Sequence, residues 1–267
     1  MTTKTKLLKW AGSKSQVSDQ IRPYLSFDRA YVEPFCGSAF FFFENSPAES
    51  YLNDLNFELI CFFKHTRNTP NLVWYYYDRV PVEEVSYYQA RDTYNELGDC
   101  PEKAGLFVYL NHFCFNGLYR TNKAGEFNTP YGGRQKPKRK LSRDNFQEFS
   151  QTLRSAHLTA RDFEAFLDRL DPDGACIYMD PPYFTNDERV FGEYGSNTFK
   201  KIDLQRLLEV SVRMSRRNKV VVSYKNCSEF REAFRKYIVG DISVIRNVGG
   251  FAGRRKSEQE LVAVLGG

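Results

Sequence analysis

Short strand-like runs that alternate with helix-like segments are the feature that most constrains the fold. The runs end in turn signals and occupy residues 30–35, 50–54, 157–160, 175–180, 219–224, 242–248 and 260–265. Helix-like segments, such as 203–217 and 228–237, lie between most of them. This alternation predicts an α/β domain with a mostly parallel sheet. The last two runs have no helix between them, so we expect them to form a hairpin at the sheet edge.

Residues 57–115 interrupt the alternation with consecutive helix-like segments, and Pro101 stands where a helix often begins. The following residues, 116–133, contain Asn-Gly, Lys-Ala-Gly and Tyr-Gly-Gly turn signals that are typical of a hairpin of short strands. From Arg120 to Arg143 there are eight Lys and Arg residues against one acid. We therefore expect a mostly helical target-recognition domain with a β-hairpin over 57–143. It would be inserted into a core domain of residues 1–56 and 144–267.

Composition excludes some classes of protein. The six cysteines and three histidines show no metal-ligand spacing, so we expect reduced thiols of a cytosolic protein and no metal. The N-terminus lacks the apolar stretch of a signal peptide, and the longest apolar run, near residues 39–43, is too short to span a bilayer. The net charge of +5 permits a nucleic-acid partner without requiring one.

Two neighbouring strand ends carry residues suited to an adenosine-bearing ligand. The segment 33–42 is a strand, a glycine turn and a helix, in which Gly37 would let the backbone approach a ligand. The second strand ends in Asn53 and Asp54, and an acid there can accept both hydroxyls of a ribose. Each observation has a structural alternative: the turn can serve the fold alone, and Asp54 can cap the next helix.

Residues 179–184, MDPPYF, close a strand-like run with an acid, two prolines and an aromatic ring. Pro181 and Pro182 donate no backbone hydrogen bond, so the strand must end. Beside a basic, aromatic-rich segment, such a turn suggests a pocket for an extruded base, where Tyr183 stacks and Asp180 accepts from an exocyclic amine. Acceptors on that amine favour attack on an electrophile, such as the methyl group of S-adenosylmethionine. The alternative is a proline-ended strand with Asp180 as a cap.

The ordered set of motifs resembles the Dam family of DNA adenine-N6 methyltransferases. The resemblance rests on LLKWAGSK (7–14), VEPFCG (32–37), LNDLN (52–56), LNHFCFNGLYRTNKAGEFNTPYG (110–132), DPPY (180–183) and RRKSEQELVAVL (254–265). These segments follow the family's order and span nearly the whole chain, and the 110–132 block is the most specific of them.

The resemblance implies a Rossmann-like, S-adenosylmethionine-dependent methyltransferase core and assigns roles to single residues. The catalytic positions are Asp180, Pro181, Pro182 and Tyr183. The cofactor positions are Trp10, Lys14, Glu33, Phe35, Gly37, Asp54, Asp162, Phe163 and Asp180. The DNA-binding positions are Lys9, Phe115, Asn116, Leu118, Arg120, Asn122, Pro130, Arg134, Lys136 and Lys138. Phe115 stands where the family often has an intercalating tyrosine, and Arg120 matches the arginine that reads a guanine. Family members with this segment commonly modify the adenine of GATC or of a longer site beginning GAT.

Four positions depart from the family pattern. Ser13 replaces the second glycine of KWAGGK, so that loop is expected to differ if the family glycine has a positive φ. Ala39 replaces the last glycine of FxGxG, where the backbone approaches the cofactor closely. His112 replaces the arginine of LNR, which is expected to weaken a phosphate contact or a structural pair. Tyr119 replaces a smaller residue beside Arg120.

The sequence therefore predicts an enzyme that methylates adenine N6 in duplex DNA by base flipping and direct transfer, with GATC as the expected site. We expect a monomer in solution, bound to no membrane, in the cytoplasm of a bacterial or phage-infected cell and associated with the nucleoid through DNA. Alternatives are a catalytically silent DNA-binding regulator of the same fold, or a methyltransferase with another base or a longer site.

Overall fold

The computed structural model describes residues 6–133, 140–184, 199–247 and 255–267. These residues form two compact units. The helical unit contains residues 6–13 and 56–158, and the sheet unit contains residues 14–55 together with the described residues from 159 onward. The predicted insert, 57–143, falls within the range of the helical unit. The predicted domain boundaries themselves stay a prediction.

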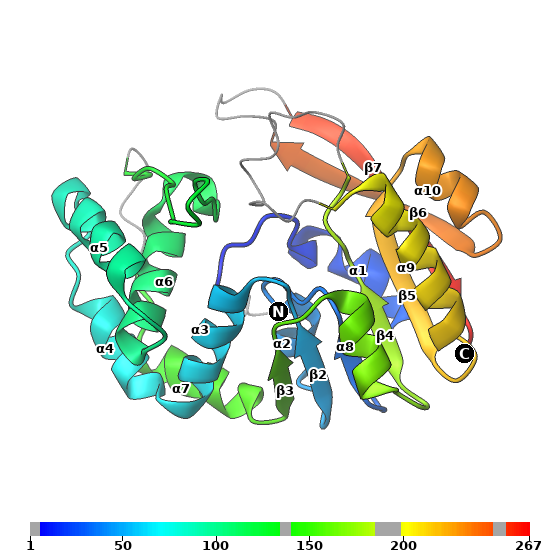
Figure 1. Ribbon diagram of the computed structural model, residues 1–267, viewed down its shortest axis with the longest axis horizontal. Helices are drawn as coiled ribbons and strands as arrows, with labels where there is room; N and C mark the ends of the chain where they lie inside the picture. Colours follow the sequence, from blue (N-terminus) through cyan, green and yellow to red (C-terminus); the bar gives the residue numbers. More distant parts are fainter. Residues whose placement is uncertain (1–5, 134–139, 185–198, 248–254) are drawn as a thin grey trace. The chain divides into compact units, whose positions relative to one another are not determined.

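The central sheet has seven strands in the order β3-β2-β1-β4-β5-β7-β6 (Figure 1). The strands are β1 (Tyr31–Glu33), β2 (Ser50–Asn53), β3 (Ala156–Thr159), β4 (Cys176–Met179), β5 (Lys219–Lys225), β6 (Ile238–Asn247) and β7 (Arg255–Leu265). β1 pairs in parallel with β2 and β4, and β4 pairs in parallel with β5. β7 runs antiparallel to both β5 and β6. The predicted α/β class, with a mostly parallel sheet and an antiparallel pair at its edge, is confirmed.

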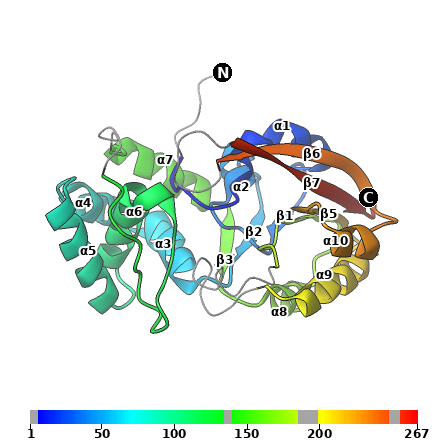
Figure 2. The same ribbon diagram turned by 90° about the horizontal axis from the view of Figure 1, so that it is seen from above.

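Helices lie on both sides of the parallel strands in the sheet unit (Figure 2). They are α1 (Ser18–Ile21), α2 (Phe40–Asn45), α8 (Phe163–Leu170), α9 (Lys201–Met214) and α10 (Ser228–Ala233). All four residues of β4 are buried, as expected for a strand that is covered on both faces. α9 buries Leu204, Leu207 and Val210 against this core. Each such side chain contributes roughly 1.5–3 kcal/mol to the stability of the fold.

In the helical unit, three helices pack against a nearly buried one, α6, and a further helix, α7, packs against α3 and α4. Its helices are α3 (Phe57–Asn68), α4 (Pro70–Asp78), α5 (Glu84–Glu96), α6 (Pro101–Phe113) and α7 (Arg143–Leu153). α6 begins at Pro101, as predicted, and is buried from Ala104 to Phe113. Gly105 lets α4 and α6 approach closely, because a Cβ atom there would lie 2.6 Å from Cβ of Tyr76. In the part of the chain that the structure describes, no helix is long and apolar enough to cross a membrane.

The segment predicted as a hairpin of short strands does pair antiparallel across a turn, but its pairing consists of two isolated bridges and not of continuous strands. The bridges join Thr121 to Phe127 and Cys114 to Tyr131. Backbone hydrogen bonds cross the segment from Asn122 N–H to the Glu126 carbonyl at 2.9 Å and from Asn128 N–H to the Arg120 carbonyl at 3.0 Å. At the tip, the side chain of Asn122 accepts from the backbone N–H groups of Ala124 and Glu126 at 2.9 and 3.0 Å, which closes the turn.

Candidate active site

Two acids meet at the point where the strand order of the sheet reverses. From β1 the chain runs outward to β2 and β3 on one side, and it then returns to form β4 on the other side of β1. Glu33 is the last residue of β1, and Asp180 directly follows β4. In open α/β sheets, ligands bind outside the carboxyl ends of the strands at such a point. The fold therefore brings two of the predicted site residues to the edge where a ligand site is expected.

Both carboxylate oxygens of Asp180 are held by neighbouring side chains. Lys14 begins the 3-10 helix Lys14–Gln16 and is 4% exposed. Its ammonium lies 2.6 Å from Oδ2 of Asp180 and 3.6 Å from Oε2 of Glu260. The hydroxyl of Ser223, on β5, donates to Oδ1 of Asp180 at 3.1 Å and lies 2.8 Å from the hydroxyl of Tyr178. These contacts fix the orientation of the predicted catalytic carboxylate.

The ring of Tyr183 is fixed from two sides. Its hydroxyl donates to Oε1 of Glu260 at 2.5 Å. Its ring meets Tyr224 edge to face, with 5.2 Å between centroids and an interplanar angle of 79°. The hydroxyl of Tyr224 accepts from the backbone N–H of Phe184 at 2.8 Å, which secures the turn after Pro181 and Pro182. The DPPY turn is thus anchored to β5 and β7 rather than projecting freely.

Burial, together with repulsion between neighbouring carboxylates, raises the pKa values of the two acids of this site, Asp180 and Glu33. Burial is the largest cause that raises the pKa of Asp180 above its ordinary value; the Lys14 ammonium opposes that rise and Glu260 adds to it. Burial also raises the pKa of Glu33 to about 8, to which the charge of Asp180 adds. Oε1 of Glu33 is buried and has no hydrogen-bond partner among the described residues. Burial therefore favours the protonated form of Glu33, whereas Lys14 favours the ionised form of Asp180.

The turn after β1 adopts the left-handed conformation twice. Gly37 has φ 48°, and Ala39 has φ 50° and ψ 44°. The backbone N–H of Gly37 donates to Oδ2 of Asp54 at 2.9 Å, which ties this turn to the end of β2. A left-handed alanine costs roughly 1–2 kcal/mol relative to a glycine-compatible turn. The departure at Ala39 therefore places a strained residue in this turn.

Asn53 is a buried structural residue whose role the sequence analysis missed. Its Nδ2 donates to the carbonyls of Pro34 and Arg161 at 3.0 and 2.9 Å. Its Oδ1 accepts from the Thr159 hydroxyl and the Arg161 N–H at 2.9 and 3.0 Å. One amide thus holds the ends of β1, β2 and β3 together. The alternative that Asp54 caps the next helix is wrong, because Asn56 caps α3 by accepting from Leu59 N–H.

Asp162 and Phe163, two of the predicted cofactor positions, lie at the start of α8. Oδ1 of Asp162 caps this helix and accepts from Arg206 at 2.8 Å. Phe163 is buried and packs against Phe35, with 5.0 Å between ring centroids. The guanidinium of Arg206 also lies over the Phe163 ring at 4.9 Å. These contacts give Asp162 and Phe163 structural partners, and their role toward a cofactor stays a prediction.

Lys9 and His112 join the N-terminal segment to α6 in the helical unit. The amide of Asn111 pairs with the backbone of Lys9, with distances of 2.8 and 2.6 Å, and the Lys9 ammonium donates to the His112 carbonyl. Nε2 of His112 lies 2.9 Å from the Leu7 carbonyl, and Nδ1 lies 3.1 Å from the Tyr77 hydroxyl. Since a carbonyl can only accept, Nε2 carries the proton and Nδ1 accepts. His112 therefore makes a structural pair in place of the family's arginine.

Trp10 and Tyr119 belong to an aromatic cluster in the helical unit. Their rings stack with centroids 5.8 Å apart, and Trp10 also stacks on Phe107 at 6.4 Å. Tyr119 thus fills space that a smaller residue would leave open. Gly12, with φ 81°, is the left-handed residue of this segment and Ser13 is not, so the serine carries no left-handed strain.

The loop of residues 114–133, called the recognition loop below, carries most of the described residues that are expected to meet DNA, and four of these are exposed. Phe115 is 43% exposed, and Asn116 beside it is left-handed with φ 55°. Within the described residues, the guanidinium of Arg120 makes no ion pair, and its Nε is buried without a hydrogen-bond partner. The other described positions of this set are Leu118, Asn122 and Pro130, of which Asn122 and Pro130 are exposed. Arg134, Lys136 and Lys138 lie outside the described residues.

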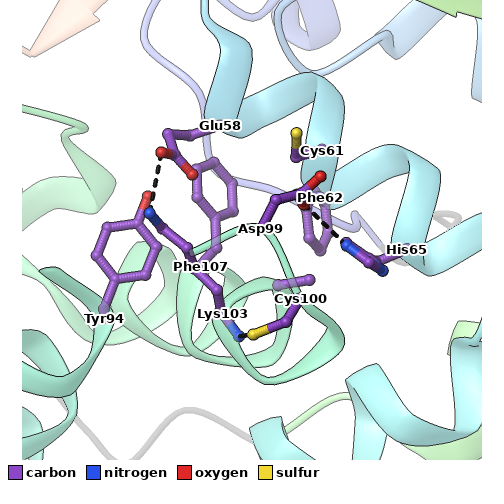
Figure 3. A pocket seen from close by; sticks show the side chains of 10 residues that line it. Glu58, Cys61, Phe62, His65, Tyr94, Asp99, Cys100, Lys103 and Phe107 are labelled. Atoms are coloured by element: carbon purple, nitrogen blue, oxygen red, sulfur yellow. Dashed lines mark hydrogen bonds and ion pairs between the residues drawn. The ribbon is translucent and has the colours of Figure 1, made fainter. Parts of the chain in front are cut away.

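A pocket in the helical unit gathers other reactive side chains (Figure 3). Its charged groups pair with one another: Lys103 lies 3.0 Å from Glu58, and His65 lies 2.9 Å from Asp99. The pocket has a volume of about 10 Å³, close to what one water molecule needs. Over the described ranges, no three His, Cys, Asp or Glu side chains are arranged to hold a metal ion. This pocket is therefore a structural feature.

Comparison with known proteins gives a consistent picture. The family model for D12 class N6 adenine-specific DNA methyltransferases matches residues 10–248. The chain is 30% identical to the retron Ec67 DNA adenine methylase of Escherichia coli, over 97% of this chain and 91% of that protein. It is 29% identical to the DNA adenine methylase of Escherichia coli K12, over 96% and 94%. It is 31% identical to the type II methyltransferase M.MjaIII of Methanocaldococcus jannaschii, over 79% and 80%.

Proposed function

The chain belongs to the D12 class of N6 adenine-specific DNA methyltransferases, and on this premise we propose that it methylates adenine N6 within GATC in duplex DNA. Membership of the family implies S-adenosylmethionine as the cofactor and DNA as the substrate. The observation that carries the proposal is the held carboxylate of Asp180, directly before Pro181, Pro182 and Tyr183 at the end of β4.

The DPPY residues would act on the exocyclic amine of an extruded adenine. An ionised Asp180 accepts a hydrogen bond from the amine, and the carbonyl of Pro181 accepts the other. These bonds draw the nitrogen toward tetrahedral geometry and free its lone pair. Tyr183 stacks on the base and holds the amine in line for the transfer. Lys14 favours the ionised form of Asp180, which the acceptor role requires.

The edge formed by β1 and β2 suits the cofactor. When bound, S-adenosylmethionine supplies an electrophilic methyl group on a sulfonium. Asp54, oriented by the N–H of Gly37, has carboxylate oxygens suited to the ribose hydroxyls. The buried carboxyl of Glu33 is a further polar group at the end of β1. These residues fit the cofactor that the family implies.

Sequence choice would come from the recognition loop. Arg120 has a guanidinium without an ion-pair partner in the described part of the chain, which suits bidentate contact with a guanine. The exposed ring of Phe115 suits insertion between bases when the target adenine leaves the helix. The Dam-type match of residues 110–132 is what supports GATC over other sites.

Two alternatives remain distinct from this proposal. A catalytically silent regulator would keep DNA binding without transfer, and the intact Asp180, Pro181, Pro182 and Tyr183 argue against it. A methyltransferase for a longer site, for cytosine N4 or for RNA would use the same pocket with another recognition partner. Base analysis of the product separates cytosine N4 and RNA from adenine in DNA, and binding of the cofactor tests the regulator.

The test is labelled methyl transfer from S-adenosylmethionine to two methyl-free duplexes, one with a single GATC and one without. We expect incorporation into the first alone, recovered as N6-methyladenine. Incorporation into both would keep the chemistry and contradict the GATC assignment. Incorporation into neither, repeated on methyl-free genomic DNA, would contradict the enzymatic proposal and favour the regulator.

A further inference from the structure

Glu260 is a buried carboxylate that the proposed mechanism does not use. It is 1% exposed and lies on β7, opposite Lys225 of β5 and Ile242 of β6. A charge in the middle of a sheet is costly unless it is paired, so a carboxylate at this position needs a partner. Its two oxygens face two residues of the proposed site, the hydroxyl of Tyr183 and the ammonium of Lys14.

We propose that Glu260 is a positioning residue that holds the Tyr183 ring in its stacking orientation and shares Lys14 with Asp180. The inference rests on the proposed function, because it assigns a role toward the DPPY residues. The hydroxyl of Tyr183 donates to Oε1 of Glu260 at 2.5 Å, and a hydrogen bond to a carboxylate is stronger than one to a neutral acceptor. With the ring edge also packed on Tyr224, this bond removes the rotation that Tyr183 would otherwise have.

Glu260 also competes with Asp180 for one cation. Lys14 lies 2.6 Å from Asp180 and 3.6 Å from Glu260, so its charge is divided unequally between them. The negative charge of Glu260 makes ionisation of Asp180 harder, while Lys14 makes it easier. The carboxylate on β7 therefore adds to the effect of burial and raises the pH above which Asp180 can accept a hydrogen bond from the amine.

The groups that face Asp180 come from five elements. They are Lys14 of the 3-10 helix, Glu33 of β1, Tyr178 of β4, Ser223 of β5 and Glu260 of β7. Replacing Glu260 by neutral glutamine removes a negative neighbour, so the pKa of Asp180 falls. The acid limb of the kcat profile then moves to lower pH. A residue that merely supported the fold would not move this limb.

The experiment is a double-mutant cycle on the full chain with Glu260→Gln, Tyr183→Phe and the double variant. We expect Glu260→Gln to lower kcat about tenfold, with little change in the KM of either substrate, because the charged hydrogen bond to Tyr183 is weakened. Tyr183→Phe keeps the ring and loses the hydroxyl. The double variant should lose less than the product of the two single losses, because both changes remove the same bond. In the double variant, the acid limb of the kcat profile should shift to lower pH as it does in Glu260→Gln, whereas Tyr183→Phe alone should not shift it.

A matched control is Glu232→Gln, which removes an exposed carboxylate from α10 in the same unit. It should behave like wild type in both readouts. If wild type methylates adenine and Glu260→Gln keeps its kcat and its acid limb, the inference is wrong and the proposed function stands. Multiplicative losses in the cycle would overturn the hydrogen-bond role. A wild type that methylates no DNA would instead refute the proposed function, and the inference with it.

Discussion

Replacing Lys14 by methionine tests whether this lysine is the cation that makes the buried acidic site stable. Methionine keeps much of the apolar stem and removes the charge. At 2.6 Å and an effective dielectric constant of about 20, the attraction between Lys14 and Asp180 is about 6 kcal/mol. Desolvation of both groups offsets part of this gain. Breaking a buried pair by removing one partner leaves a net loss of about 3–5 kcal/mol in the free energy of unfolding.

The loss should depend on pH, and its sign follows from Asp180. In the wild type, Lys14 lowers the pKa of Asp180 against the effect of burial. Without Lys14 that pKa rises further above its value in the unfolded chain. A group with a raised pKa favours the folded state when it is protonated, so the variant should be most stable at acid pH and lose stability as the pH rises. The deficit relative to wild type therefore grows from pH 5.5 to pH 8.

The assay is urea unfolding of the wild type, Lys14→Met and the exposed-site control Lys236→Met at pH 5.5 and pH 8. The control should stay within about 0.5 kcal/mol of the wild type. A deficit for Lys14→Met of less than about 1 kcal/mol, equal at the two pH values, would refute the argument that this cation compensates the buried carboxylates.

Three further predictions concern single side chains. Asp180→Ala should abolish methyl transfer while DNA binding measured by fluorescence anisotropy is retained; measurable turnover would contradict its role. Arg120→Ala should reduce discrimination at one guanine of the site by about 1–3 kcal/mol in kcat/KM, and unchanged discrimination would rule out base reading by this residue. Ala39→Gly should raise the free energy of unfolding, measured with urea, by about 0.5–1 kcal/mol, because glycine adopts the left-handed conformation at lower cost. A lower free energy of unfolding for this variant would show that no strain is stored at this position.

The elements of the sheet could be predicted from the sequence because parallel strands leave a strong local signal. Buried runs such as those at Ala175–Asp180 and Lys219–Tyr224 are continuous apolar stretches with turns at both ends. The DPPY turn was recognisable because two prolines are rare at a strand end. The turn signals in residues 116–133 correctly indicated antiparallel pairing, but they did not show that it would be limited to two isolated bridges.

The hydrogen-bond and ion-pair partners of the site residues could not be predicted from the sequence. Ser223 and Glu260 are separated in sequence from Asp180, and their contact depends on β5 and β7 lying beside β4 in the sheet. The acid of the C-terminal motif was visible in the sequence, but its partner was not. In the same way, His112 could be identified as a departure, while its hydrogen bonds to Leu7 and Tyr77 required the packed helices.

The position of Glu260 on β7 has a consequence for the order in which the chain is synthesised. Lys14 leaves the ribosome early, and Asp180 follows after most of the sheet has been made. The acceptor for the Tyr183 hydroxyl emerges later still, with the strand that inserts between β5 and β6. A nascent or prematurely terminated chain can therefore carry all four DPPY residues and still lack the acceptor for the Tyr183 hydroxyl. On the roles proposed for Glu260 and Tyr183, competence for catalysis is acquired late in translation, when β7 enters the sheet.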